Sequence, residues 1–284
     1  KELLAHVLKS EGAKATPAHV NSEMGVAQWL LNILGKPDSV PTLLIVEMGA
    51  YRRGEIALLG RIAQPTIGVV TAVGTQHLAL FGSAENILAA KSELVQSLPL
   101  TGHAFLNGDD EGCRKMRNIA PCPVTMVGTG GPADMEATDI EETTEGLKFR
   151  VGQSQFQVSL RGTHNVRNIL LSIAVARKLG MSDEAIGAAL RTFEPPSRTF
   201  QVRRQSGVEI LDDTYNSSPQ SFKAAIAWAK SQPFDHKILL AAGLIELGEA
   251  FESTHRELGA QAQSIFERVI FLEAESAELF AHGL

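Results

Sequence analysis

Three residues in the first third of the chain are of types that bind metal ions and nucleotides. Glu47 ends the apolar run 42–47, and His77 follows the apolar run 66–73. Lys91 lies in the helix-like segment that comes next. If both runs are parallel strands, the glutamate and the histidine share the carboxyl edge of the sheet, where open α/β folds bind ligands. An oxygen ligand and a nitrogen ligand beside a lysine suit a magnesium–nucleotide site.

Each of these residues also has an ordinary interpretation. A glutamate at a strand end can be a cap or half of an ion pair, and a histidine in a loop can be incidental. A lysine in a helix usually lies on the solvated face and pairs with a nearby carboxylate. The residues within reach for such pairs are Arg52 and Arg53 for the glutamate, and Glu85 and Glu93 for the lysine.

Alternating apolar and helix-period segments predict the elements that position these residues. The expected strands are 42–47, 66–73, 103–107 and 123–127, and the expected helices are 1–10, 23–35, 84–98 and 110–119. This βαβ alternation is typical of a doubly wound α/β domain with a parallel sheet. Between about 134 and 160 short alternating strands predict a hairpin, and two helices follow at 165–179 and 182–193.

A domain boundary is expected at the segment Glu194–Ser197, because paired prolines stop a helix and stiffen a linker. We therefore expect a first domain over 1–195 and a second α/β domain over 196–284. The elements expected in the second domain are strands 207–213, 237–242 and 268–272 and helices 219–231 and 252–267. Three strands are few for a nucleotide-binding fold, so we expect this domain to be incomplete.

Composition excludes some classes of protein. A net charge of −6 argues against a general nucleic-acid binder, because no basic surplus is present to neutralise phosphates. No apolar stretch approaches the roughly 20 residues that span a bilayer, and the first residues predict an amphipathic helix and not a signal peptide, so we expect a cytoplasmic protein. Cys113 and Cys122 could pair with each other, but they form no disulfide framework and lack metal-ligand neighbours, so we expect them to be reduced and structural. The chain opens at Lys1 without an initiator methionine, so we expect an N-terminal portion to be missing.

The segments around the three candidate ligands carry a resemblance. Met-Gly-Ala-Tyr-Arg-Arg-Gly-Glu-Ile follows Glu47, and Thr-Ala-Val-Gly-Thr-Gln-His-Leu-Ala-Leu-Phe-Gly-Ser contains His77. Together with Lys91 they resemble the central, ATP-binding domain of the Mur ligases. The resemblance implies that the three residues lie on a second magnesium ion and that the lysine is carbamylated. A carbamate forms from the neutral amine, which burial and nearby positive charge favour by lowering the lysine pKa.

The run Gly-Thr-His-Asn-Val-Arg-Asn over 162–168 resembles the adenine-side motif of the same family. It coincides with an expected helix start, where His164 and Asn165 can act as caps. Asn168 offers the paired donor and acceptor that an adenine edge requires. A pure capping role for all three is the alternative.

The run Leu-Asp-Asp-Thr-Tyr-Asn-Ser-Ser-Pro over 211–219 resembles a signature of the branch that adds D-alanyl-D-alanine. The resemblance implies that Asp213 accepts from the ribose hydroxyls, that Arg198 faces phosphate, and that Asn216 helps to line the reacting carboxyl group. An ordinary helix start rich in Asp, Asn, Ser and Pro is the alternative. Asn21 begins a segment, 21–26, that resembles one lying near the muramoyl substrate; a turn with a helix cap explains it as well.

Three departures from the family pattern stand beside the resemblance. Ala72 replaces an asparagine before the histidine, and Leu244 stands where an aspartate is expected. The Gly-Lys-Thr phosphate loop, expected immediately before Lys1, is not in the sequence.

The resemblance implies an ATP- and magnesium-dependent amide ligase that joins D-alanyl-D-alanine to UDP-N-acetylmuramoyl tripeptide, although this chain itself is expected to be inactive. Other Mur ligases, folylpolyglutamate synthetases and a non-catalytic binding module derived from a ligase are the alternatives.

Overall fold

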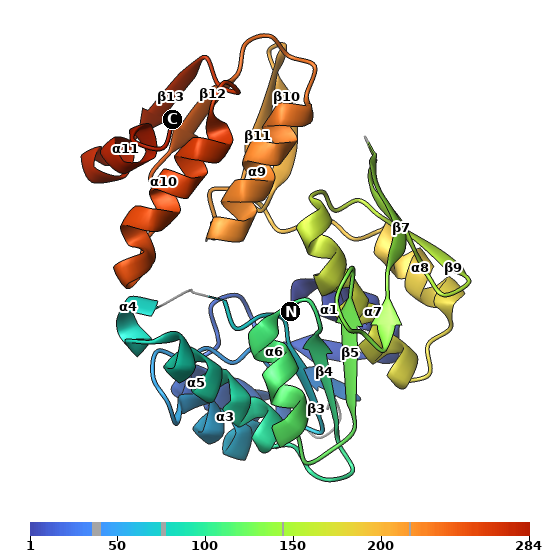
Figure 1. Cartoon of the computed structure of the whole chain (residues 1–284). Helices are drawn as coiled ribbons and strands as arrows, with labels where there is room; N and C mark the ends of the chain where they lie inside the picture. Colours follow the sequence, from blue (N-terminus) through green and yellow to red (C-terminus); the bar gives the residue numbers. More distant parts are fainter. Residues whose placement is uncertain (36–40, 75–77, 144, 216) are drawn as a thin grey trace. The chain divides into compact units, whose positions relative to one another are not determined.

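The computed structural model describes residues 1–35, 41–74, 78–143, 145–215 and 217–284 (Figure 1). These residues form two compact units. The first combines Lys1–Gly74, Ser83–Leu160 and Asn165–Glu194, and the second is built mainly from Pro195–Leu284. The short helix α4 (Leu78–Phe81) and the segment Arg161–His164 group with the second unit.

A four-stranded parallel sheet forms the centre of the first unit. Its order is β3 (Ile67–Val70), β4 (His103–Asn107), β5 (Val124–Gly128) and β6 (Met135–Glu136). The three longer strands fall on the predicted apolar runs, which confirms those strands. All residues of β4 after His103 are buried, as expected for a strand covered by other elements on both faces.

A second parallel pair precedes this sheet in the chain. It joins β1 (Ala13–Ala15) to β2 (Leu43–Ile45), the strand that leads to Glu47. Among the described residues β2 and β3 belong to different hydrogen-bonded sheets, so the structure does not place the runs 42–47 and 66–73 in one sheet as expected. A small apolar cluster packs β2 against α2 (Glu23–Leu34) and α3 (Glu55–Ala63). The sequence did not predict α3, because it begins after Gly54, which has a φ of 94° and provides no capping side chain.

The main core of the first unit lies between sheet and helices. Its buried members come from α1 (Glu2–Val7), β4, β5, α7 (Val166–Lys178) and α8 (Asp183–Arg191). Helix α7 is the most deeply buried, with an unbroken buried run from Ile169 to Ala176. Two further helices complete the unit: α5 (Ala84–Gln96) and α6 (Glu111–Met116).

An antiparallel sheet covers part of the same core. Its strands are β7 (Thr138–Thr143), β8 (Gly146–Val151) and β9 (Ser154–Val158). The predicted hairpin is therefore present as β8 and β9, and Gly152 supplies the positive φ of 64° in its tight turn. Phe149 on β8 pairs directly with Phe156 on β9, and their rings stack with centroids 5.9 Å apart.

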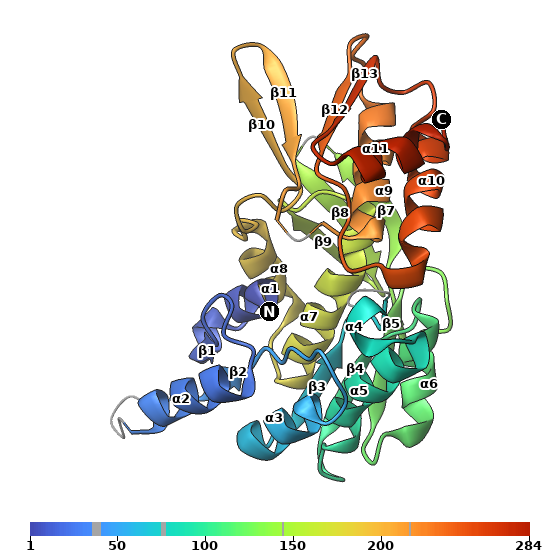
Figure 2. The same ribbon diagram turned by 90° about the vertical axis from the view of Figure 1, so that its left-hand side faces the viewer.

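The second unit contains a hairpin and a parallel strand pair. The hairpin joins β10 (Gln201–Gln205) to β11 (Val208–Asp212), and the parallel pair joins β12 (Ile238–Ala241) to β13 (Arg268–Phe271). Figure 2 shows the helices beside β12 and β13. They are α9 (Pro219–Ser231), α10 (Phe251–Ala262) and α11 (Ala274–Ala281). Strand β10 and helix α11 were not predicted from the sequence.

Helix α9 matches its predicted range because its start is encoded locally. Ser218 and Ser221 form a reciprocal capping box, and Pro219 occupies the first helical position. Elsewhere, Cys113 and Cys122 are buried and unpaired with each other, as expected. No helix within the described part of the chain is long and apolar enough to cross a membrane.

Candidate functional site

Lys91 projects from α5 to the chain segment that follows β3. Its Nζ donates hydrogen bonds to the carbonyl oxygens of Ala72 and Val73, at 2.9 and 2.7 Å. Burial lowers the pKa of this lysine below its usual value of 10.5. The predicted alternative, a solvated lysine paired with Glu85 or Glu93, is wrong.

The carboxylate of Glu93 instead accepts hydrogen bonds from the backbone N–H groups of Gly54 and Ala57.

Glu47 follows β2, as predicted, and its side chain is 42% exposed. Its partner is Lys1, whose Nζ lies 3.2 Å from the carboxylate, and its own N–H donates to the hydroxyl of Thr16. The alternative ion pair with Arg52 is not formed, because Arg52 binds Glu55 at 2.9 Å. Within the described ranges Glu47 and Lys91 share no hydrogen bond.

The remaining predicted ligand, His77, lies outside the described residues, so the predicted crevice of Glu47, His77 and Lys91 stays a prediction. Among the residues that the structure describes, no group of three or more His, Cys, Asp or Glu side chains is placed to hold a metal ion.

The start of α7 brings two of the predicted nucleotide ligands together. Asn165 is the N-cap residue, and the Nδ2 of Asn168 donates to its Oδ1 at 3.4 Å. Asn165 makes no side-chain capping bond to the described part of the helix, so the capping alternative is wrong for this residue. His164 groups with the second unit, and its ring contacts Phe200 edge-on at 5.4 Å.

Two loops of the second unit carry Arg198 and Asp213. They are joined by two hydrogen bonds: Tyr215 N–H donates to the Arg198 carbonyl, and Phe200 N–H donates to Asp213 Oδ1, both at 3.0 Å. Arg198 has a φ of 64°, an uncommon conformation for a residue other than glycine. The structure thus brings these two predicted residues into one loop pair, and Asn216 lies outside the described residues.

Asn21 lies next to the segment that follows Glu47. Its carbonyl accepts from Gly49 N–H at 2.9 Å, and a side chain on Gly49 would approach its Nδ2 to 2.9 Å. The glycine therefore allows the close approach of Asn21 to the backbone at the end of β2.

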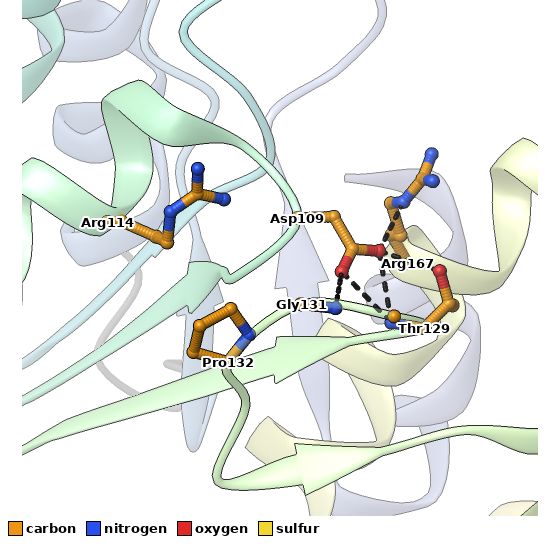
Figure 3. A pocket seen from close by; sticks show the side chains of 7 residues that line it. Asp109, Arg114, Thr129, Gly131, Pro132 and Arg167 are labelled. Atoms are coloured by element: carbon orange, nitrogen blue, oxygen red, sulfur yellow. Dashed lines mark hydrogen bonds and ion pairs between the residues drawn. The ribbon is translucent and has the colours of Figure 1, made fainter.

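An open pocket of about 500 Å³ lies at the carboxyl ends of β4 and β5, beside the start of α7 (Figure 3). Its lining combines two arginines, an aspartate, a threonine and a turn: Asp109, Arg114, Thr129, Gly130, Gly131, Pro132 and Arg167. Asp109 accepts from Arg167 Nε at 2.7 Å, and Arg114 Nη1 donates to the Gly108 carbonyl at 2.7 Å.

Sequence reasoning missed this pocket. The available signal was a pair of polar or glycine-rich segments, 107–110 and 128–131, that each follow a predicted strand. Because neighbouring parallel strands end at the same edge of a sheet, such segments meet in space.

Two of the three departures from the family pattern, Ala72 and Leu244, have structural explanations. Ala72 contributes its carbonyl oxygen, not its side chain, to the contact with Lys91. Leu244 is 3% exposed and belongs to the core of the second unit, which a leucine side chain fills without a polar partner. Its N–H donates to Nε2 of the buried His255 at 3.1 Å.

Comparison with protein families finds two matches along the chain. The model of the Mur ligase middle domain matches residues 1–176, and the model of the Mur ligase glutamate ligase domain matches residues 197–284.

The curated relatives of the chain are ligases as well. The chain is 36% identical over 275 residues to the UDP-N-acetylmuramoyl-tripeptide–D-alanyl-D-alanine ligase of Mycobacterium tuberculosis, covering 92% of this chain and 53% of that protein. It is 31% identical over 249 residues to the enzyme of the same name from Bacillus subtilis, covering 86% and 53%. The chain thus spans about half the length of these relatives.

Solved structures of such ligases are also similar. MurF from Acinetobacter baumannii superposes with a TM-score of 0.89 at 27% identity, covering all of this chain and 62% of that one. MurF from Thermotoga maritima in complex with ADP gives a TM-score of 0.85 at 30% identity, covering 99% and 65%.

Proposed function

Because the chain belongs to the Mur ligase family, we propose that it carries nucleotide- and metal-binding residues of a ligase that makes peptidoglycan precursors. The proposed reaction joins D-alanyl-D-alanine to UDP-N-acetylmuramoyl tripeptide. ATP phosphorylates the tripeptide carboxylate, the amine of the dipeptide attacks the acyl phosphate, and the amide forms as ADP and phosphate leave. We assign residues 1–195 to the nucleotide-binding domain and 196–284 to the C-terminal domain.

The observation that carries this proposal is the environment of Lys91. A partly buried amine that contacts two carbonyl oxygens beyond a strand end, with no carboxylate bonded to it in the described residues, is unusual for a structural lysine. Lowered lysine pKa values of this kind concentrate at functional sites. The neutral amine is the form that reacts with carbon dioxide, so the site suits the carbamate that the family resemblance implies.

Magnesium is the implied metal, and the residues present fit it in part. Glu47 supplies a half-exposed carboxylate, the hard oxygen ligand that magnesium prefers. Lys91 fits only as a carbamate, because its ammonium group is a hydrogen-bond donor. When bound, magnesium would neutralise charge on the nucleotide phosphates.

The other residues position substrates. Asn165 and Asn168 offer amide groups to the adenine edge, with His164 next to them in the chain. Arg198 faces phosphate with its forked guanidinium, and Asp213 accepts from the ribose hydroxyls. Two further residues complete the proposed set: Asn216 beside the reacting carboxyl group and Asn21 near the muramoyl substrate.

Carbamylation of Lys91 is expected to depend on pH. Since burial lowers the pKa of this lysine, its neutral fraction at a given pH exceeds that of an exposed lysine, and it rises with pH. At constant dissolved ¹³CO₂, a carbamate resonance in the ¹³C NMR spectrum should therefore grow between about pH 7 and 9. Lys91→Arg should remove this resonance. Identical spectra for both proteins would contradict the assignment.

The adenine assignment predicts a modest loss on removal of one amide. Asn168→Ala deletes one or two neutral hydrogen bonds, so ATP affinity should fall roughly three- to tenfold, whereas affinity for inorganic triphosphate should not change. Isothermal titration calorimetry with both ligands measures the difference. Gln96→Ala, at the far end of α5, serves as an amide-deleting control. An equal loss for both ligands would contradict a role in recognising the base.

A further inference from the structure

Asp109 is an internal anion enclosed by the loop that follows β5. Its two carboxylate oxygens accept from Thr129 N–H at 3.1 and 3.0 Å, from the Thr129 hydroxyl at 2.7 Å and from Gly131 N–H at 3.1 Å (Figure 3). Its side chain is 12% exposed. Successive backbone N–H groups that converge on one point form an anion-binding nest. Here a carboxylate of the protein itself occupies the nest.

The glycines of this loop are explained by the same carboxylate. A Cβ on Gly128 would lie 2.8 Å from Asp109 Oδ1, and one on Gly131 would lie 3.2 Å from the same atom and 3.0 Å from the Gly108 carbonyl oxygen. At Gly128 a side chain would collide with the carboxylate, and at Gly131 it would make tight contacts with the carboxylate and with the Gly108 carbonyl oxygen. The loop Gly128–Gly131 is therefore shaped around Asp109 and does not offer these amides to a phosphate.

Asp109 also holds the first turn of α7. Arg167 Nε donates to Asp109 Oδ2 at 2.7 Å, and Arg167 lies in the chain between Asn165 and Asn168. Burial acts to raise the pKa of Asp109, but hydrogen bonds from Arg167 and Thr129 outweigh it and hold the pKa below its usual value. The carboxylate is thus charged at neutral pH and keeps its charge-assisted bond to the guanidinium.

The core fixes the apolar face of the first turn of α7, where Val166 and Ile169 are buried. The bond between Arg167 and Asp109 joins this turn to the ends of β4 and β5. It therefore fixes the rotation of the polar face on which the two asparagines lie, because residues on one helical turn move together.

We infer that Asp109 is a positioning residue for the nucleotide base: through Arg167 it fixes the first turn of α7 and with it the amide groups of Asn165 and Asn168. This inference rests on the proposed adenine-binding role of those two asparagines. Asp109 itself would contact neither the base nor the reacting atoms. It acts by restricting the orientations of the two asparagine amides before the nucleotide arrives, which lowers the entropic cost of nucleotide binding.

The test uses the 284-residue chain with substitutions on either side of the contact. Arg167→Gln leaves the nest intact and releases only the helix, and Asp109→Asn places an amide NH₂ against the N–H groups of the nest. Glu111→Gln is the matched control, because it removes one carboxylate charge from an exposed ion pair with Lys115 on neighbouring α6. The first readout is the side-chain amide region of the ¹H–¹⁵N NMR spectrum without nucleotide. The second is the affinity for ATP and for inorganic triphosphate.

We expect Arg167→Gln to shift or broaden the side-chain amide signals of Asn165 and Asn168. ATP affinity should fall roughly three- to tenfold, as for loss of one of the amide contacts, with triphosphate affinity unchanged. Asp109→Asn should have the same effects, and Glu111→Gln neither. Amide signals that stay at their wild-type positions in Arg167→Gln would overturn the inference, even if Asp109→Asn failed to fold.

The proposed function has a separate outcome. One result is that Asn168→Ala leaves ATP affinity unchanged while Arg167→Gln still moves the amide signals. That result would refute the adenine-binding role of Asn168 and would identify the contact between Arg167 and Asp109 as purely structural. It would therefore also overturn the positioning role of Asp109. If Asn168→Ala weakens ATP binding and Arg167→Gln does not, the proposed function stands and only the inference about Asp109 is overturned.

Discussion

Ligase activity of the 284-residue chain alone should be at least about 10³-fold below that of an intact Mur ligase. The sequence contains no Gly-x-x-x-x-Gly-Lys-Ser/Thr motif, whose backbone amides and lysine hold the β- and γ-phosphates in nucleotide-binding folds of this kind. Loss of a single preorganised donor to a developing anion typically costs 10²–10³ in rate, and here several donors are concerned. Binding of the base at α7 requires none of them.

Phosphate release that depends on both UDP-N-acetylmuramoyl tripeptide and D-alanyl-D-alanine is the measurement for this prediction. An intact family member assayed in parallel shows that the substrates and conditions are competent. Turnover by this chain at the rate of the intact enzyme would refute the expectation, and would mean that other backbone amides hold the phosphates.

The second large effect is expected for Asp213. In an intact ligase that carries this C-terminal unit, Asp213→Ala should lower turnover by about 5- to 150-fold, the equivalent of roughly 1–3 kcal/mol for one charge-assisted hydrogen bond. The structure adds a second consequence. Asp213 Oδ1 accepts the N–H of Phe200, a buried residue with a φ of 46°, so the alanine variant also releases the loop that carries Arg198.

Two further variants separate these effects. Asp213→Asn retains an oxygen acceptor for Phe200 and loses the charge, so it should keep the thermal midpoint of the parent while turnover still falls. Asp212→Ala removes the preceding carboxylate, which binds Arg203 and Thr214, and should change turnover little. Equal turnover for Asp213→Ala and the parent, with the fold intact, would identify Asp213 as an ordinary helix-start residue.

Much of the fold was predictable because local sequence patterns, such as apolar runs and helix caps, specify the same elements that tertiary packing requires. Strand β4 and helix α9 match their predicted ranges, since a continuous apolar run and a capping box each specify one outcome. Helix α3 was missed because Gly54 provides no start signal, and β10 was missed because an exposed hairpin strand has no apolar pattern.

The candidate site was predictable in position and less so in contacts. The helix that carries Lys91 and the strand that ends before Glu47 could be predicted from the spacing of apolar residues. The hydrogen-bond and ion-pair partners of these two residues could not be predicted, because the carbonyl oxygen of Ala72 and the ammonium group of Lys1 come from segments 19 and 46 positions away. The contacts of Asp109 combine residues from the loop after β4, the loop after β5 and α7, which no local pattern connects.

The burial of Leu244 restricts which substitutions this chain can accept, and in which order. Its side chain packs in the core of the second unit, and its N–H is held by Nε2 of His255. An aspartate placed there in one step would have to leave the core or bury its carboxylate without a partner, at a cost that a single domain rarely tolerates. The loop would first have to turn outward through changes at its neighbours. Burial of Leu244 therefore disfavours a single-step replacement of this leucine by aspartate.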